Sequence, residues 1–152
     1  MNTTTEITAP VGSSSSHASP TARRLTAGAR IFLGLIFFVF GLNGFLNFIP
    51  PPSKPMPENA MGFLGGLMKA GYILPLVAGT QVLVGLFLLS NRFVPLALIL
   101  IAPIIVNIVA FHLFLEPSGL PVAIVVLALE LYLLFRYRVA YRPMLASKVT
   151  LG

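Results

Sequence analysis

The sequence contains no cysteine, which excludes disulfide bonds, thiolate metal sites and thiol–disulfide chemistry by this chain alone. The same absence removes any sign of the redox environment in which the protein folds. Charged residues are scarce as well, at 9% of the chain, whereas a soluble domain carries about a quarter. Because 57% of the residues are hydrophobic and the mean hydropathy is +0.93, we expect most of the protein surface to avoid water.

The sequence motifs of stand-alone enzymes are also missing. There is no P-loop, no GxGxxG after a strand, and no HExxH, GxSxG or CxxC. No two histidines are placed to ligate a haem from facing helices, and a lone His112 without a second His or Cys is a poor metal site. Catalysis by this chain alone is therefore not supported, and whether the protein is an enzyme stays open.

The chain does have four long apolar runs, each near the length of ~20 residues that crosses the ~30 Å hydrocarbon core. They cover residues 30–48, 72–90, 93–115 and 120–135, and the last run extends as far as Tyr141. Two short polar turns, Asn91-Arg92 and residues 116–119, separate the last three runs, so these helices must be antiparallel neighbours. The predicted fold is an all-α membrane protein, an antiparallel bundle of four transmembrane helices.

The remaining segments divide the chain further. Residues 1–22 form a Ser/Thr-rich tail that we expect to be disordered, residues 23–142 form the transmembrane domain, and residues 143–152 form a C-terminal tail. A proline-rich linker follows the first run, because residues 50–52, 55 and 57 are all proline. Glu58-Asn59 then opens a short segment, residues 60–72, which is too short to span and is predicted to lie in the outer membrane interface.

The cations indicate how the bundle is oriented. If the N-terminus is inside, only Lys54 and Lys69 of the ten Lys and Arg residues lie outside. The positive-inside rule therefore places both termini in the cytoplasm. The net charge of +6 is explained by this topology, and we expect the lipid bilayer and not a nucleic acid as the partner of these cations.

Polar residues interrupt the apolar runs and supply the candidate site. Because an acid at mid-bilayer costs ~2.5–3.5 kcal/mol on the insertion scale, it needs a partner or a wet cavity. Counting along the antiparallel runs predicts a ladder of polar groups from the outer mouth to the centre of the bundle. We assign Asn43, Gln81, Asn107 and Glu130 as ligand-binding candidates, with Asn47 and His112 at the mouth.

These residues also have structural explanations. Asn43 and Gln81 are suited to interhelical hydrogen bonds, and Asn47 and His112 to solvation at the interface. Asn107 and His112 are five residues apart, about 140° around a helix, so they do not point at one spot. Glu130 is as well explained by a functional role as by a structural one. The glycines at positions 34, 41, 44 and 85 are predicted to permit close helix contact.

Several stretches resemble the DoxX-like family of small integral membrane proteins. The likeness is carried by RIFLGLIFFVFGLNGF at the first run, by the proline-rich loop and a small-residue segment ending GY, and by GTQVLVGLFLLSNRFVPLAL. The stretch APIIVNIVAFHLFLEPSGLP is similar to one branch of that family, and the resemblance runs from about Arg24 to Met144. It implies four transmembrane helices in a bacterial inner membrane. Many relatives carry an acid where this chain has Gln81.

The resemblance implies one of several roles. Some relatives are membrane subunits of a thiosulfate:quinone oxidoreductase, and others are linked to oxidative-stress complexes or to the assembly of secreted enzymes. Our first hypothesis is an accessory or subunit of a membrane redox system, with an outer-facing pocket for a small amphipathic ligand such as a quinone and a membrane or periplasmic redox partner. The alternatives are a non-catalytic scaffold or assembly factor and, third, a small transporter subunit. No cofactor motif is evident, and the sequence does not give the oligomeric state.

Overall fold

The computed structural model describes residues 19–50 and 54–145, and helices dominate them. The long helices are α1 (Pro20–Leu46), α2 (Glu58–Ala70), α3 (Ile73–Leu89), α4 (Val94–Phe114) and α5 (Leu120–Arg136). Shorter turns of helix are η1 (Pro117–Gly119), α6 (Arg138–Tyr141) and η2 (Arg142–Leu145). The described residues contain no β-strand, so the prediction of an all-helical protein is confirmed there.

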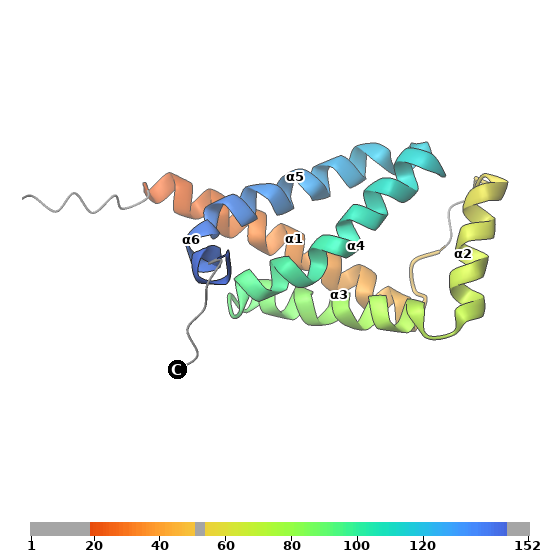
Figure 1. The fold of residues 1–152 in the computed structure, drawn as a ribbon, viewed down its shortest axis with the longest axis horizontal. Coiled ribbons are helices and arrows are strands. Elements are labelled where there is room, and N and C mark those ends of the chain that lie inside the picture. The colour runs from red at the N-terminus through yellow and green to blue at the C-terminus, as the bar shows by residue number, and fades with distance from the viewer. Residues whose placement is uncertain (1–18, 51–53, 146–152) are drawn as a thin grey trace, which may run out of the picture.

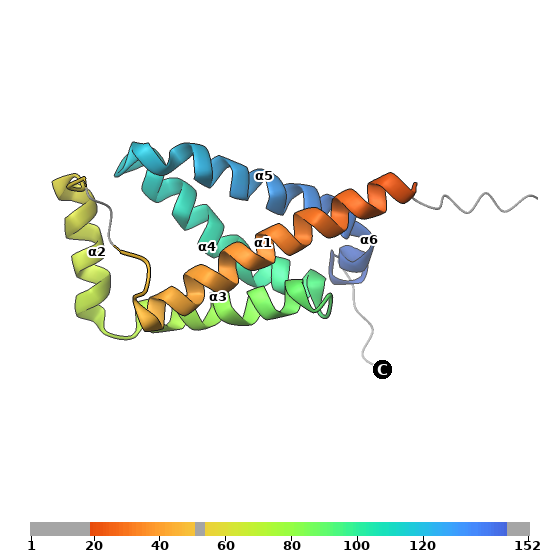
Figure 2. The same ribbon diagram turned by 180° about the vertical axis from the view of Figure 1, so that it is seen from behind.

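The long helices other than α2 run up and down between two ends of an elongated bundle (Figure 1). One end holds the start of α1, the α3–α4 turn and α6; we call it the arginine end, after Arg23, Arg30, Arg92 and Arg136. The opposite end holds the α1–α2 linker, α2 and the α4–α5 turn, and we call it the linker end. Figure 2 shows the same arrangement from behind, with α1 lying along α3. The described chain thus begins and finishes at the same end of the bundle.

Within residues 19–50 and 54–145, three helices are long and apolar enough to cross a membrane: α1, α4, and α5 together with η1. The second predicted span is the exception. Its helix α3 has 17 residues, which is slightly too short for a candidate span. It becomes long enough only when it is counted together with α2, from which it is bent by 90°. The structure therefore has three or four candidate spans. The short segment after the linker forms a helix of its own, α2, and its place in the outer interface stays a prediction.

Helix boundaries differ from the prediction mainly in α1. This helix begins at Pro20, ten residues before the predicted span and inside the segment predicted as a disordered tail. The Ser19 side chain accepts a hydrogen bond from the Ala22 N–H, and Pro20 follows it, which is a favoured start for a helix. The rest of the predicted tail, residues 1–18, lies outside the described part of the chain, as do residues 146–152 of the predicted C-terminal tail.

Glycines bring α1 and α3 into backbone contact, as the sequence predicted. A Cβ at Gly41 would lie 2.7 Å from the Val82 nitrogen, and one at Gly85 would lie 2.7 Å from the Phe38 backbone. Both distances are shorter than real Cβ contacts. Only glycine allows this approach, so the α1–α3 pair forms a tight unit along which the other helices pack.

The last predicted span does not continue to Tyr141 as one helix. Helix α5 ends at Arg136, the chain turns at Tyr137, and α6 begins at Arg138. The Tyr141 hydroxyl donates to the Pro95 carbonyl, 3.2 Å away, at the first turn of α4. Burial, followed by the nearby charges of Glu130 and Tyr137, raises the pKa of Tyr141 to about 12, so this donor stays protonated at physiological pH.

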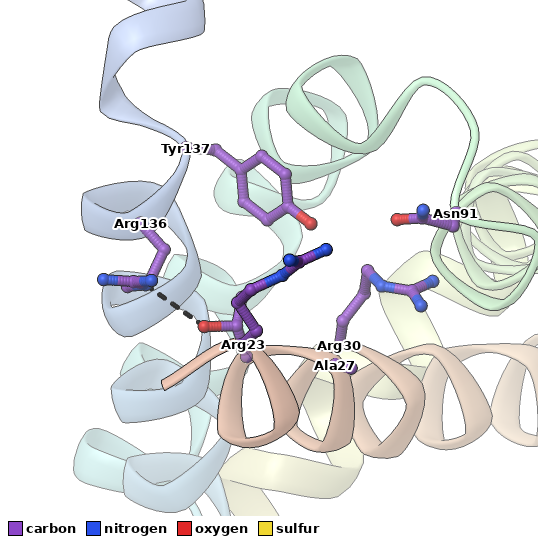
Figure 3. A pocket seen from close by; sticks show the side chains of 7 residues that line it. Arg23, Ala27, Arg30, Asn91, Arg136 and Tyr137 are labelled. Atoms are coloured by element: carbon purple, nitrogen blue, oxygen red, sulfur yellow. Dashed lines mark hydrogen bonds between the residues drawn. The ribbon is translucent and has the colours of Figure 1, made fainter. Parts of the chain in front are cut away.

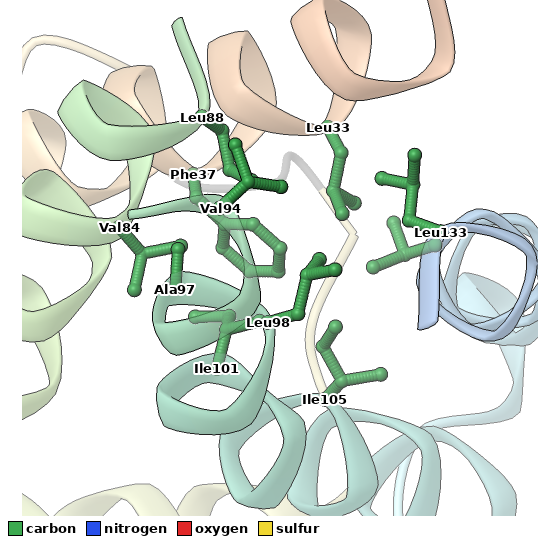
Figure 4. Close-up of a cluster of buried hydrophobic side chains, with 11 residues drawn as sticks. Leu33, Phe37, Val84, Leu88, Val94, Ala97, Leu98, Ile101, Ile105 and Leu133 are labelled. Atoms are coloured by element: carbon green, nitrogen blue, oxygen red, sulfur yellow. The ribbon is translucent and has the colours of Figure 1, made fainter. Parts of the chain in front are cut away.

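The apolar core fills the arginine half of the bundle (Figure 4). Each of α1, α3, α4 and α5 contributes buried side chains to it. The cluster consists of Leu33, Phe37, Val84, Leu88, Val94, Ala97, Leu98, Ile101, Ile105, Val126 and Leu133. Helix α4 supplies the largest share, but only up to Ile105. Beyond that residue α4 and α5 lean away from α3 toward the linker end (Figure 1).

Candidate ligand cavity

A cavity of about 310 Å³ lies between α1, α3, α4 and α5 in the linker half of the bundle. Its walls are Ile36, Phe37 and Phe40 of α1, Ile108 of α4, and Val122, Ala123 and Val126 of α5. The polar residues that reach it are Gln81 of α3 and His112 of α4. Mostly apolar walls with a few polar groups are typical of small-molecule sites, and this volume is at their lower limit of ~300 Å³.

Gln81 is positioned by the close contact of α1 and α3. A Cβ at Gly41 would lie 2.9 Å from the Gln81 Cβ, so the missing side chain on α1 makes room for the glutamine on α3. Gln81 is half-buried. Its amide offers two N–H donors and one acceptor oxygen to the cavity, so it is able to bind either a carbonyl or a hydroxyl.

His112 lies between this cavity and a second, larger hollow at the linker end. The second hollow has a volume of about 630 Å³ and is lined by residues 54–57 of the linker and by the α4–α5 turn. His112 lines both, with 23% of its side chain exposed. Its predicted position at the mouth of a binding site and its role in binding both stay predictions.

The α4–α5 turn holds His112 in place. Its Nδ1 lies 2.9 Å from the Glu116 carbonyl oxygen and 3.2 Å from Glu116 Oε2, and its ring packs against Gly119. The Ser118 hydroxyl donates to Glu116, and this bond, together with the Gly119 N–H, lowers the pKa of that carboxyl. The charged Glu116 therefore fixes one ring nitrogen, which leaves Nε2 as the nitrogen available to a ligand.

Glu130 is buried below the cavity, toward the arginine end. It is 2% exposed, and neither of its carboxyl oxygens has a hydrogen-bond partner among the described residues. It is one helical turn after Val126, which lines the cavity, and one turn before Leu133, which belongs to the core. Helical side chains lean toward the N-terminus of their helix, so the carboxyl is directed toward the level of Val126.

The three asparagines do not join Gln81 in this cavity. The Asn43 Oδ1 accepts a hydrogen bond from the Ile49 N–H at 2.6 Å, so this amide ties the end of α1 to the linker. Asn47 ends α1 in a left-handed conformation and is exposed. Asn107 is exposed and lines a different hollow of about 220 Å³ with Phe63 of α2.

The structure thus corrects the predicted ladder in one respect. The polar residues do not share a single chamber, because Asn43 is used by the chain's own linker and Asn107 faces α2. The angular separation of Asn107 and His112 is confirmed, since they line different hollows. The residues that remain near one another are Gln81 and His112, with Glu130 below them. Whether any of them binds a ligand stays a prediction.

Sequence reasoning missed a second polar site, at the arginine end. Arg30 was assigned only to membrane topology, yet it is 8% exposed and lines a cavity with Arg23 and Arg136. Arg23 and Arg30 are seven residues apart, a spacing that puts them on one face of α1 two turns apart. The seven-residue spacing could have predicted that Arg23 and Arg30 share a face of α1. Nothing in the sequence predicts that Arg136 lines the same cavity.

Comparison of this chain with protein-family models, with curated proteins and with solved structures gave no match.

Proposed function

We propose that this chain is a DoxX-like protein that crosses a bacterial inner membrane four times, with both termini in the cytoplasm. In this proposal α3 is the second span and α2 lies in the outer interface. Support comes from the candidate spans α1, α4 and α5, and from the 90° bend that separates α2 from α3. The arginine end then faces the cytoplasm, and the linker end faces the periplasm.

The function we propose is binding of a small amphipathic molecule, with a quinone as the candidate class, in support of a membrane or periplasmic redox protein. The observation that carries it is the meeting of Gln81 and His112, from different helices, in one otherwise apolar cavity. Polar groups inside a membrane bundle are costly, and two that converge on a hollow are better explained by a ligand than by packing alone.

The cavity suits a flat ring with hydrogen-bonding edges. Phe37 and Phe40 supply aromatic surface, and the Gln81 amide offers donors and an acceptor to oxygens on such a ring. Because His112 Nδ1 donates to Glu116, its Nε2 offers a lone pair that accepts a hydrogen bond from a ring hydroxyl, as in the quinol. The cavity wall also reaches the outside of the bundle, because Phe40 is 54% and Val122 67% exposed. An apolar tail attached to the ring has a lateral route from the cavity to the acyl chains.

Glu130 would be the proton-active group of this site. A buried carboxyl without a partner is unfavourable, and a ligand or water reaching it from the cavity would satisfy it. A quinone that is reduced to a quinol takes up two electrons and two protons. A carboxyl group beneath the ring would be able to pass a proton to it. The redox partner would supply the electrons, because no redox cofactor motif is evident in the chain.

The first test is binding of a short-chain ubiquinone analogue to the purified protein. Replacing Gln81 with Leu removes both hydrogen-bonding groups, and we expect binding to weaken several-fold, as for the loss of one or two hydrogen bonds. Thr80→Val is the matched control, because the Thr80 hydroxyl donates to Leu76 within its own helix. The binding proposal fails if wild type does not bind the analogue, and the site assignment fails if both variants bind like wild type.

A second variant separates binding from proton chemistry. Glu130→Gln keeps the shape of the side chain but cannot release a proton. We expect it to change how binding of the analogue depends on pH, while the folded protein and its helix content are retained. If Glu130→Gln leaves both the affinity and its pH dependence unchanged, Glu130 is a structural residue.

A non-catalytic scaffold is the second candidate function, and one observation favours it. Two polar side chains at the linker end form hydrogen bonds with the protein itself, since Asn43 accepts from the Ile49 N–H and His112 binds Glu116. A scaffold needs ordered surfaces and no ligand. Co-purification of a stoichiometric partner that survives both Gln81→Leu and Glu130→Gln supports this function over the first.

A further inference from the structure

A separate cavity, of about 340 Å³, lies at the arginine end, at the opposite end of the bundle from the proposed ligand site. It is formed where the first turns of α1 meet the end of α5 and the α3–α4 turn. Its lining residues are Arg23, Thr26, Ala27, Arg30, Asn91, Arg136 and Tyr137. Figure 3 shows Arg23 and Arg30 rising from α1 toward Tyr137 and Asn91, with Arg136 on the adjoining helix.

Arg30 is a structural part of this cavity. It is buried, and its guanidinium donates to the Leu88 carbonyl in the last turn of α3. The carbonyls at a helix C-terminus carry partial negative charge, so this bond both caps α3 and fixes the arginine. The position of its positive charge at the cavity wall is thereby set by the fold.

Arg136 is oriented by a hydrogen-bond network that joins α1 to α5. Its Nε donates to the Thr26 hydroxyl at 3.1 Å, and that hydroxyl donates to the Ala22 carbonyl at 2.8 Å. Because the one hydroxyl hydrogen of Thr26 is already donated to Ala22, the Tyr132 hydroxyl, 3.0 Å away, donates to the Thr26 oxygen as well. With Nε used, the two terminal nitrogens of Arg136 remain to bind something else.

The charges around this cavity are unbalanced. Among residues 19–50 and 54–145, the only close contact between a carboxyl and a basic side chain is that of Glu116 with His112, at the opposite end of the bundle. No acidic side chain of the described residues lines the cavity, whereas three guanidinium groups do. Like charges held together repel one another, and the repulsion grows where water is partly excluded. An anion in the cavity would remove this cost.

We propose that this cavity binds a phosphate group, supplied by the headgroup of an anionic phospholipid. The planar guanidinium groups of Arg23 and Arg136 match the oxygens of phosphate, and the Tyr137 hydroxyl and Asn91 amide add neutral donors. At ~30 Å³ for each water molecule, the cavity has room for a phosphate and some waters. Its place at the ends of α3 and α5 is the depth at which headgroups lie, and basic pockets between transmembrane helices bind such lipids.

A simpler explanation is that these arginines only mark the cytoplasmic side. That explanation accounts for the sign of the charges, but it requires no common cavity and no fixed geometry. The two explanations differ for Arg136→Lys. This change keeps the charge, so topology alone predicts no effect, whereas a shaped phosphate site predicts weaker binding because lysine lacks the two-pronged fork.

The test measures lipid retained by the full-length protein. The protein is purified from nanodiscs that contain equal phosphatidylglycerol and phosphatidylcholine, and its bound lipid is counted by native mass spectrometry. We expect the wild type to retain phosphatidylglycerol selectively. Arg23→Gln and Arg136→Gln should each weaken retention about fivefold or more, the effect of losing one headgroup-binding cation. Arg23→Gln is the safer variant, since Arg23 is exposed and is not part of the Thr26 network.

Matched controls remove the same charge outside the cavity. Arg92→Gln and Arg138→Gln both lie at the arginine end, and Arg138 stacks on Phe135, 4.3 Å from its ring centre. We expect both controls to retain the lipid like wild type, and equal losses in controls and cavity variants would overturn the proposal. Absence of selective retention by wild type would overturn the lipid as the source of the phosphate. The second measurement is then the stability of the protein in phosphatidylcholine nanodiscs with added inorganic phosphate. If phosphate does not stabilise wild type, or stabilises Arg23→Gln and Arg136→Gln equally well, the phosphate site is overturned too; the opposite result is stabilisation that requires both arginines. That result supports the phosphate site and makes its source soluble.

Discussion

At the scale of single residues, the most consequential feature is a missing side chain. Gly41 and Gly85 let the backbones of α1 and α3 touch, and this contact places Gln81 at the wall of the ligand cavity. Without a hydrophobic effect between helices in lipid, such close packing supplies much of the attraction that holds a membrane bundle together. The same small residues therefore serve both stability and the site.

We expect Gly85→Ala to destabilise the protein. The added Cβ would lie 2.7 Å from backbone atoms of Phe38, which cannot rotate away, so α1 and α3 must separate. Such overpacking costs about 1–3 kcal/mol, measured as the free energy of unfolding in detergent. Gly28→Ala in α1 is the control, because its Cβ would meet nothing within 4 Å; we expect no loss there or a gain of up to ~1 kcal/mol. Equal stability of the two variants would mean that the helices are not this close.

At the scale of elements, the short helix α2 is the least conventional part. It packs lightly, with Ala60 its only buried residue, while Met61 and Met68 are exposed. Gly71, with φ of 77°, makes the sharp turn into α3 without the cost that a side chain would bring. One inward contact is aromatic, since the rings of Phe63 and Phe111 lie 5.8 Å apart. The bend puts α2 across the end of the bundle (Figure 2).

If α2 lies along the outer membrane surface, a water-soluble reagent should reach both of its ends equally well. Because the chain has no cysteine, single thiols are introduced cleanly as Glu58→Cys and Lys69→Cys. If α2 lies along the outer surface, a membrane-impermeant maleimide should label both from the periplasm at similar rates. If α2 instead continues α3 into the membrane, the two positions differ in depth by about 17 Å, and one of them should be protected.

The helices were the most predictable elements. The predicted spans 72–90 and 93–115 match α3 and α4 to within one residue at each end, because Asn91 and the flanking polar residues stop both runs. Asn91 adopts the left-handed conformation, with φ of 57°, which asparagine tolerates and which closes α3. The start of α1 was missed because Pro20 and Ser19 signal a helix locally, while the surrounding composition signals disorder.

At the scale of the whole molecule, the two ends differ in chemistry. The arginine end gathers cations around a cavity, whereas the linker end has prolines, the short helix α2 and a hollow beside His112. The tightly packed core lies nearer the first, and the proposed ligand cavity nearer the second.

The proposed orientation is tested by labelling opposite ends. Arg92→Cys lies in the α3–α4 turn and Lys54→Cys in the α1–α2 linker, and both native residues are exposed. With intact cells, an impermeant thiol reagent should label Lys54→Cys only, and Arg92→Cys should react after the inner membrane is permeabilised. The reverse pattern would place both termini in the periplasm and would contradict the positive-inside assignment.

Local sequence was enough to predict the helical character, the positions of the apolar runs, the tight turns and the glycines that bring helices together. These follow from local rules, since hydropathy, helix length and the absence of a Cβ are properties of short stretches. The sequence did not predict which polar residues meet in the folded protein. Rotation about each helix axis separates Asn107 from His112, a hydrogen bond from the Ile49 N–H occupies Asn43, and the packing of α5 against α1 sets Arg136 near Arg23. Such meetings depend on how whole helices pack against one another, and no stretch of sequence specifies that alone.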